Sequence, residues 1–228
     1  MVGDYAVSRK ISVTELMELS LRLKATRCPD GIELVHRERY QNIAAPRYGR
    51  SGPDWFAYRS GRQEHTVIRE TVDLEDALVC RFVNATDDDK RVTFLSRFGL
   101  PGDVLGFVGI GIAEPRNIIL GRQRVLRRLL QDAGSGDVAR ARKAANESLR
   151  HASPDSMSLE PGGRMVWTMR SLMDFMYMEI VTAADNDARL GSCKRCGSLF
   201  LYGKGTKRRK TAKWCGLTCR VGAWRSSK

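Results

Sequence analysis

Four cysteines near the C-terminal end constrain what this chain can fold into more than any other feature of the sequence. They lie in "CKRCGSLFLYGKGTKRRKTAKWCGLTCR" as a Cys-x2-Cys pair, an interval of 18 residues and a Cys-x3-Cys pair. Such short–long–short spacing is typical of a structural zinc site with four cysteine ligands. It predicts one structural Zn2+ per chain, with the ligands Cys193, Cys196, Cys215 and Cys219.

The residues around the cysteines predict a finger of the treble-clef or ribbon type. Gly197 suits the left-handed corner of a knuckle around the first pair. "SLFLY" favours a short strand, the basic loop after it would lead into a return strand ending near Trp214, and "CGLTCRVGAW" favours a helix. On that helix Cys215 and Cys219, four residues apart, would share one face.

Four thiolates complete a tetrahedral shell, so the zinc is expected to be structural and not catalytic. A Cys-x-x-Cys redox pair and an iron–sulfur cluster are the competing interpretations. A redox pair would not need the second pair of cysteines. An iron–sulfur cluster would be unusual among the eleven Lys and Arg residues that follow Cys193. The other two cysteines, Cys28 and Cys80, are not assigned to the metal.

The formal net charge of +13 is unevenly placed. From Cys193 to the end there is no Asp or Glu, whereas the first 192 residues hold all 26 acids and 28 of the 39 bases. A cationic segment of this kind favours a polyanionic partner, most often nucleic acid, and the alternative is a tail that only improves solubility. The candidate nucleic-acid contacts are Lys204, Lys207, Arg208, Arg209, Lys210, Lys213, Arg220 and Arg225.

The segment from Cys193 onward resembles the zinc finger of bacterial CGNR proteins. The matching parts are Cys193, Cys196, Phe200, the "TKRRK" run, Trp214-Cys215 and Cys219. The layout is also similar, with a larger helical region before a finger at the very end. Those proteins are regarded as stress-related transcription regulators, so the resemblance implies zinc at the four cysteines and DNA as the partner. The signature Cys-Gly-Asn-Arg is Cys219-Arg220-Val221-Gly222 here, so the role of its last three residues is not carried over.

The rest of the chain predicts a mainly α-helical (α+β) protein. Residues 1–190 are expected to form a mostly helical regulatory or assembly domain with a small β element, and residues 191–228 the nucleic-acid-binding finger. Helices are predicted over 12–24, 73–86, 87–99, 115–136, 137–152 and 164–186, two exposed strands within 32–71, a long loop at 45–61 and a linker at 153–163. Methionines recur along the last helix, which favours a buried face over a ligand surface.

Catalytic and membrane functions are not expected. No Walker loop, Gly-x-Ser-x-Gly or His-Glu-x-x-His motif occurs, the three histidines lie far apart, and the acids at 87–89 suit a helix N-terminus better than a metal site. No apolar run reaches the ~18 residues of a membrane span. Without a signal-like N-terminus the protein is expected in the cytoplasm, where thiols stay reduced.

These observations favour a cytoplasmic DNA-binding protein of bacterial type that regulates transcription through a zinc finger. Two alternatives stay open: an RNA-binding or ribosome-associated factor, and a zinc module that docks an acidic protein. The helical body could also assemble the chain into a homo-oligomer. Trp214 and Trp224 could stack on bases or belong to the small core of the finger.

Overall fold

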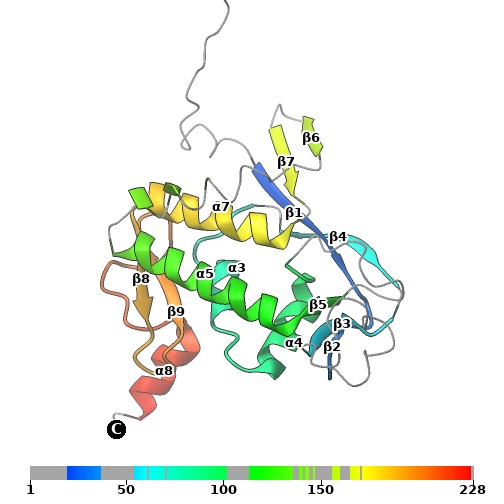
Figure 1. Cartoon of the computed structure of the whole chain (residues 1–228). Helices are drawn as coiled ribbons and strands as arrows, with labels where there is room; N and C mark the ends of the chain where they lie inside the picture. The colour runs from blue at the N-terminus through cyan, green and yellow to red at the C-terminus, as the bar shows by residue number, and fades with distance from the viewer. Residues whose placement is uncertain are drawn as a thin grey trace, which may run out of the picture.

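In the computed structural model, four strands come before the first described helix, and helices and further strands follow along the chain (Figure 1). The structure describes residues 20–36, 54–60, 62–69, 71–101, 113–135, 139–140, 142–143, 146, 156–159, 165–169 and 171–226. The elements are β1 (Ser20–Arg27), β2 (Ile32–Val35), β3 (Trp55–Tyr58), β4 (Glu64–Arg69), α3 (Leu78–Val83), α4 (Asp88–Phe98), β5 (Ala113–Pro115), α5 (Arg116–Gly134), β6 (Ser156–Leu159), β7 (Met165–Met169), α7 (Leu172–Asp185), β8 (Ala188–Ser192), β9 (Leu199–Gly203) and α8 (Leu217–Arg225).

The expectation of a mainly helical protein is wrong, because the described residues form three sheets as well as five helices. The largest sheet has the order β4-β1-β7-β6, the second β2-β3-β5, and the third is the β8-β9 hairpin. Among the strand pairs of the described residues, only β1 and β7 are parallel; the others are antiparallel. The fold is therefore mixed α/β.

The helix predicted over 12–24 is wrong over residues 20–24, which belong to β1; residues 12–19 lie outside the described part. Leu21, Leu23 and Ala25 are buried and alternate with partly exposed residues, which is the two-residue period of a strand. The helical pattern instead relied on Leu16, Leu19 and Leu23. The strand β1 pairs with β4 and also with β7, which lies more than 100 residues further along the chain, so the sequence did not show which partners it would have.

The long loop predicted at 45–61 contains a buried strand. In β3, all four residues from Trp55 to Tyr58 are buried, and the strand lies between β2 and β5. A continuous apolar run of this length is what a central strand requires. The two strands predicted within 32–71 are present as β2 and β4, although β2 begins and ends on buried residues.

Helix α7 is the centre of the main hydrophobic core. Twelve of its residues, Leu172, Met173 and Phe175–Ala184, are buried, and it packs against α3, α5 and β1. The helix predicted over 164–186 is therefore half right: residues 165–169 form β7, and α7 starts after Ser171, whose Oγ accepts a hydrogen bond from the Asp174 N–H. Met169, Met173 and Met176 are buried as predicted, whereas Met165 is exposed.

The helices predicted over 73–86, 87–99 and 115–136 are present as the shorter α3, α4 and α5. The Asp87 carboxylate caps α4 by accepting from the Lys90 N–H at 2.8 Å, which confirms the helix-start reading of these acids. Gly99 ends α4 with φ +86°. The helix predicted over 137–152 and the linker at 153–163 lie mostly outside the described residues, although residues 156–159 form β6.

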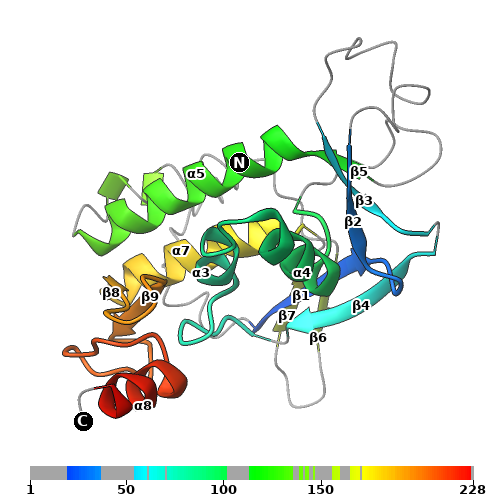
Figure 2. The same cartoon turned by 90° about the horizontal axis from the view of Figure 1, so that it is seen from below.

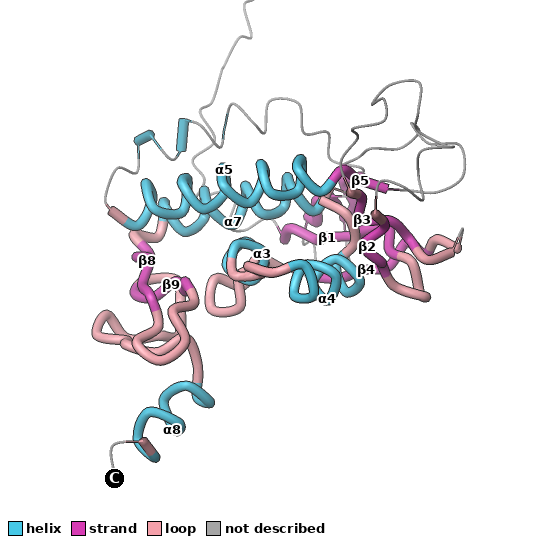
Figure 3. Tube along the Cα trace, turned by 60° about the horizontal axis from the view of Figure 1, so that its bottom comes forward, coloured by secondary structure: helices cyan, strands magenta, loops and turns pink. Residues whose placement is uncertain are grey.

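The β8-β9 hairpin and α8 lie at one end of the molecule, and the β2-β3-β5 sheet lies at the opposite end (Figures 1 and 2). The hairpin packs on α5, α7 and α3. Helix α8 has no buried residue and stands away from the other elements (Figure 3). No helix among the described residues is both long and apolar enough to cross a bilayer.

Candidate metal centre

The first cysteine pair lies in the turn between β8 and β9, and backbone hydrogen bonds shape this turn. The Cys193 N–H donates to the Ser198 carbonyl and the Gly197 N–H to the Cys193 carbonyl, both at 2.9 Å. Gly197 has φ +73°, the left-handed conformation that the sequence predicted for it. The short turn therefore directs both thiols to one point.

The second pair comes from the start of α8. Cys215 precedes the N-cap residue Gly216, and Cys219 lies in the first turn of the helix. The expectation that both cysteines lie on one face of the helix is therefore wrong, because Cys215 precedes the helix and only Cys219 lies in it. The return strand predicted before Trp214 is absent from residues 204–216, and β9 pairs instead with β8.

The four sulfur atoms lie within 4.8 Å of one another. The sulfurs of Cys196, Cys215 and Cys219 form a triangle with sides of 3.6 Å. A tetrahedral site with metal–sulfur bonds of about 2.3 Å has edges of about 3.8 Å, whereas a disulfide needs about 2.05 Å. The cluster can therefore hold a metal ion, and its sulfurs are too far apart to be disulfides.

Two of the four thiols have a lowered pKa and the other two have a raised pKa. Burial raises the pKa of the Cys193 thiol, but hydrogen bonds from the N–H groups of Cys196, Cys215 and Arg195 lower it by more. The result is a pKa of about 6. The Ser198 hydroxyl, 3.3 Å from the Cys196 sulfur, lowers the pKa of that thiol as well.

The second pair behaves in the opposite way. Burial and the neighbouring sulfurs raise the pKa of Cys215. The hydrogen bond with Cys215 lowers the pKa of Cys219, but the interactions with Cys196 and Cys193 raise it by more, so the pKa of Cys219 is also raised. Negative charge on the first pair thus opposes ionisation of the second, and a bound cation would remove this opposition and release the remaining protons.

We call residues 188–226, from β8 to the end of α8, the finger. Its strand β9 belongs to the main core, because Leu201 is buried there and Leu199 packs against it. The predicted boundary at residue 190 lies inside β8. The two-domain division remains a prediction.

The cationic residues predicted to contact nucleic acid fall into two groups. Seven are exposed on the finger: Lys204, Lys207, Arg209, Lys210, Lys213, Arg220 and Arg225. The eighth, Arg208, is half-buried and turned inward. Its guanidinium donates to the carbonyls of Glu75 (2.5 Å), Leu201 (3.2 Å) and Cys215 (2.8 Å), and it lies 5.6 Å from the centre of the Phe200 ring.

The basic loop, residues 204–213, is fastened at both ends. The Gly203 N–H donates to the Arg208 carbonyl at 3.1 Å, and the Lys194 N–H in the knuckle donates to the Lys213 carbonyl at 3.0 Å. A pocket of about 410 Å³ lies between this loop and the start of α8. Lys207, Arg209, Lys213 and Arg220 line it together with half-buried Trp214.

Sequence reasoning missed the residues that join the finger to the rest of the protein. Asn84, at the end of α3, binds the backbone of Leu199, and Arg208 binds the carbonyl of Glu75. Both contacts link positions more than 100 residues apart, and no spacing or motif in the sequence predicts them. Comparison of the sequence with protein-family models and with curated proteins found no match.

Proposed function

We propose that the cysteine cluster binds one structural zinc ion and that the finger it shapes binds DNA in a transcription regulator. The observation that carries the proposal is the exposed set of cations between the two cysteine pairs. A metal held by both pairs would fix the two ends of the basic loop and present its charges as one surface.

Zinc suits the donor set better than other common metals. Four thiolates at tetrahedral spacing favour zinc, whereas hard cations prefer oxygen ligands. The four sulfurs leave no position for a substrate or water, so this ion would stabilise the finger and take no part in chemistry. Structural zinc typically contributes about 10–16 kcal/mol to small modules.

The pocket beside α8 is the best candidate for a phosphate contact. Gly216 gives the helix no side-chain cap, so its first N–H groups are available as donors. Arg220 and Lys213 line the same pocket, and Glu75 is its one acidic residue among those the structure describes. Cations and helix N–H groups around one pocket are a suitable arrangement for the backbone of a nucleic acid.

The exposed Lys and Arg residues predict a strong salt dependence. If about six of them contact phosphates, log K falls with log salt at a slope of roughly −5. Fluorescence anisotropy with a labelled DNA duplex at several salt concentrations measures this slope. Alanine at Lys204, Lys207, Arg209 and Lys210 should reduce it to roughly −2 and weaken binding at every salt concentration.

A second variant with the same change in charge is the control. Arg59, Arg62, Arg128 and Lys143 are exposed and lie outside the finger, and their replacement by alanine should leave the slope near that of the original protein. Equal losses in the two variants would contradict the role of the finger. Parallel titrations with duplex RNA and single strands test the target, because tighter binding to RNA would replace DNA as the partner.

A further inference from the structure

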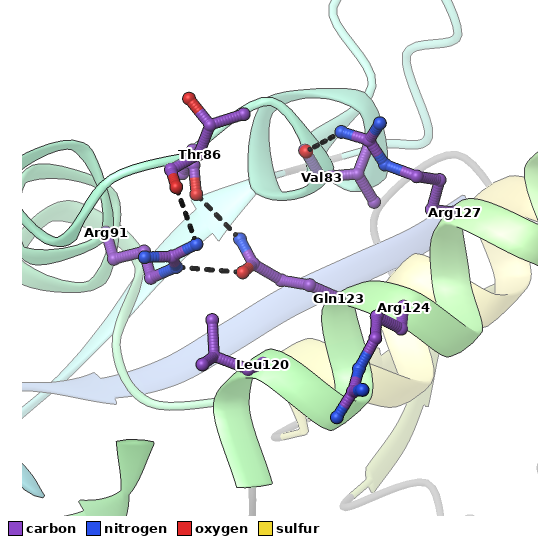
Figure 4. A pocket seen from close by; sticks show the side chains of 8 residues that line it. Val83, Thr86, Arg91, Leu120, Gln123, Arg124 and Arg127 are labelled. Carbon is purple, nitrogen blue, oxygen red and sulfur yellow. Dashed lines mark hydrogen bonds between the residues drawn. The ribbon is translucent and has the colours of Figure 1, made fainter. Parts of the chain in front are cut away.

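A second pocket, of about 390 Å³, lies between α5 and the segment that joins α3 to α4 (Figure 4). It is lined by Val83, Ala85, Thr86, Arg91, Leu120, Gln123, Arg124 and Arg127. No acidic residue is among these eight. The volume falls within the roughly 300–1,000 Å³ that is usual for small-molecule sites.

Positive charge around this pocket is only partly neutralised by the described residues. The side chain of Arg91 is 8% exposed and pairs with Asp88 at 2.8 Å. The same carboxylate also pairs with Arg116 at 3.0 Å, so one negative charge is shared between two positively charged guanidinium groups. Arg127 donates to a neutral carbonyl, that of Val83, at 2.8 Å. The Arg124 side chain is exposed and has no hydrogen bond or ion pair with any described residue.

The polar wall of the pocket is held in place before any ligand arrives. The buried Gln123 side chain donates to the carbonyls of Phe82 and Ala85, at 2.7 and 3.0 Å. Its amide oxygen accepts from the Nε of Arg91 at 2.9 Å, a hydrogen bond that Figure 4 marks with a dashed line. Because this wall is fixed, a ligand would not have to order it, and that favours binding.

We propose that this pocket binds a small organic oxyanion, a carboxylate or phosphate carried on an apolar group. Arg124 and Arg127 supply positive charge for the oxyanion, since guanidinium groups match carboxylate and phosphate in shape. Val83, Ala85 and Leu120 supply the apolar part of the lining. The site lies outside the finger and does not depend on the function proposed for it.

Isothermal titration of the full-length protein tests the proposal. The probes are acetate, butyrate and hexanoate, with the matching monoalkyl phosphates in a second series and hexanol as the uncharged control. Each methylene that reaches the apolar wall should strengthen binding roughly fourfold. One series should bind more tightly than the other, which identifies the headgroup, and hexanol should not bind. The absence of saturable binding in both series would overturn the proposal.

Two arginines on α5 make a matched pair of variants. Arg124 lines the pocket, whereas Arg128 is exposed on the same helix and does not line it. Arg124→Ala should weaken hexanoate binding tenfold or more, and Arg128→Ala should leave it unchanged. Equal effects would mean that only general charge matters and would overturn the site. If Arg124→Ala weakens binding to DNA while no small anion binds, the arginine belongs to a nucleic-acid surface and the small-ligand proposal fails.

Discussion

Asn84 and Leu199 exchange two hydrogen bonds that join α3 to the first residue of β9. The Asn84 side-chain amide donates to the Leu199 carbonyl, and the Leu199 N–H donates to the Asn84 side-chain oxygen, both at 2.8 Å. The pair lies next to the knuckle that carries Cys193 and Cys196. The amide therefore holds the cysteine-bearing end of the chain against the hydrophobic core.

Replacing Asn84 should loosen the finger. Asn84→Ala leaves the N–H and carbonyl of Leu199 without these partners, which should lower the free energy of unfolding by about 1–3 kcal/mol. Hydrogen exchange at the Leu199 amide should become faster. Asn117→Ala is the control, because the Asn117 side chain is exposed and its one hydrogen bond among the described residues is with the N–H of the next residue, Ile118. Equal losses in both variants would refute the assignment.

Arg208 and Arg209 should respond differently to the same substitution. Arg208→Lys keeps the charge but removes the forked donor that reaches Glu75, Leu201 and Cys215. Thermal unfolding should show a loss of about 1–3 kcal/mol. Arg209→Lys, at an exposed position, should change stability by less than about 0.5 kcal/mol. If the two variants are equally stable, Arg208 does not have the structural role that its contacts indicate.

Glu179 should make the stability depend on pH. The carboxyl group is buried on α7 and accepts the N–H groups of Leu78 and Val79, at 2.9 and 2.7 Å. Burial raises its pKa to about 8, against the lowering effect of those two hydrogen bonds. Between the unfolded pKa of 4.5 and about 8, the folded protein keeps a proton that the unfolded chain releases. The stabilising contribution of the group is therefore complete below pH 4.5 and lost as the pH rises towards 8.

Urea unfolding across this pH range checks the prediction. In Glu179→Gln the pH dependence should flatten, because the group no longer titrates. The variant should also be less stable by about 1–3 kcal/mol, since a carboxamide oxygen can serve only one of the two N–H groups and its NH2 faces the other. Glu64→Gln makes the same substitution at an exposed position and should change the stability by less than about 1 kcal/mol. A profile that is unchanged in Glu179→Gln would contradict the assignment.

Two glycines should respond in opposite directions to alanine. A Cβ on Gly99 would lie 2.4 Å from the Thr26 carbonyl oxygen, and its φ of +86° disfavours any side chain. Gly99→Ala should therefore cost more than about 1 kcal/mol. Gly121 lies within α5 with nothing within 4 Å of its Cβ position, so Gly121→Ala should stabilise the protein by about 0.5–1 kcal/mol. Thermal unfolding measures both, and the same sign for both would be inconsistent with this geometry.

Local features of the sequence could be predicted, and those that depend on distant partners could not. The gathering of the four sulfurs, the left-handed Gly197 and the Asp87 cap follow from spacing and from local chemistry. The prediction of a mainly helical fold was wrong for two reasons. The strand β1 forms by pairing with β4 and β7, which are distant in the sequence, and the buried strand β3 lies in a segment whose Gly and Pro residues are typical of a loop. The inward position of Arg208 was not predictable either. The neighbouring basic side chains in "TKRRK" are chemically alike, and only their contacts in the folded protein distinguish them.

Native mass spectrometry of the purified chain tests the central claim most directly. The original protein should carry one zinc ion per chain, and Cys215→Ser should lose it, because three thiolates and a hydroxyl bind zinc more weakly. Cys28→Ser should retain the metal, since Cys28 is buried against Ser60 and away from the cluster. A metal-free protein whose finger remains folded, or equal metal loss in the two variants, would contradict the account.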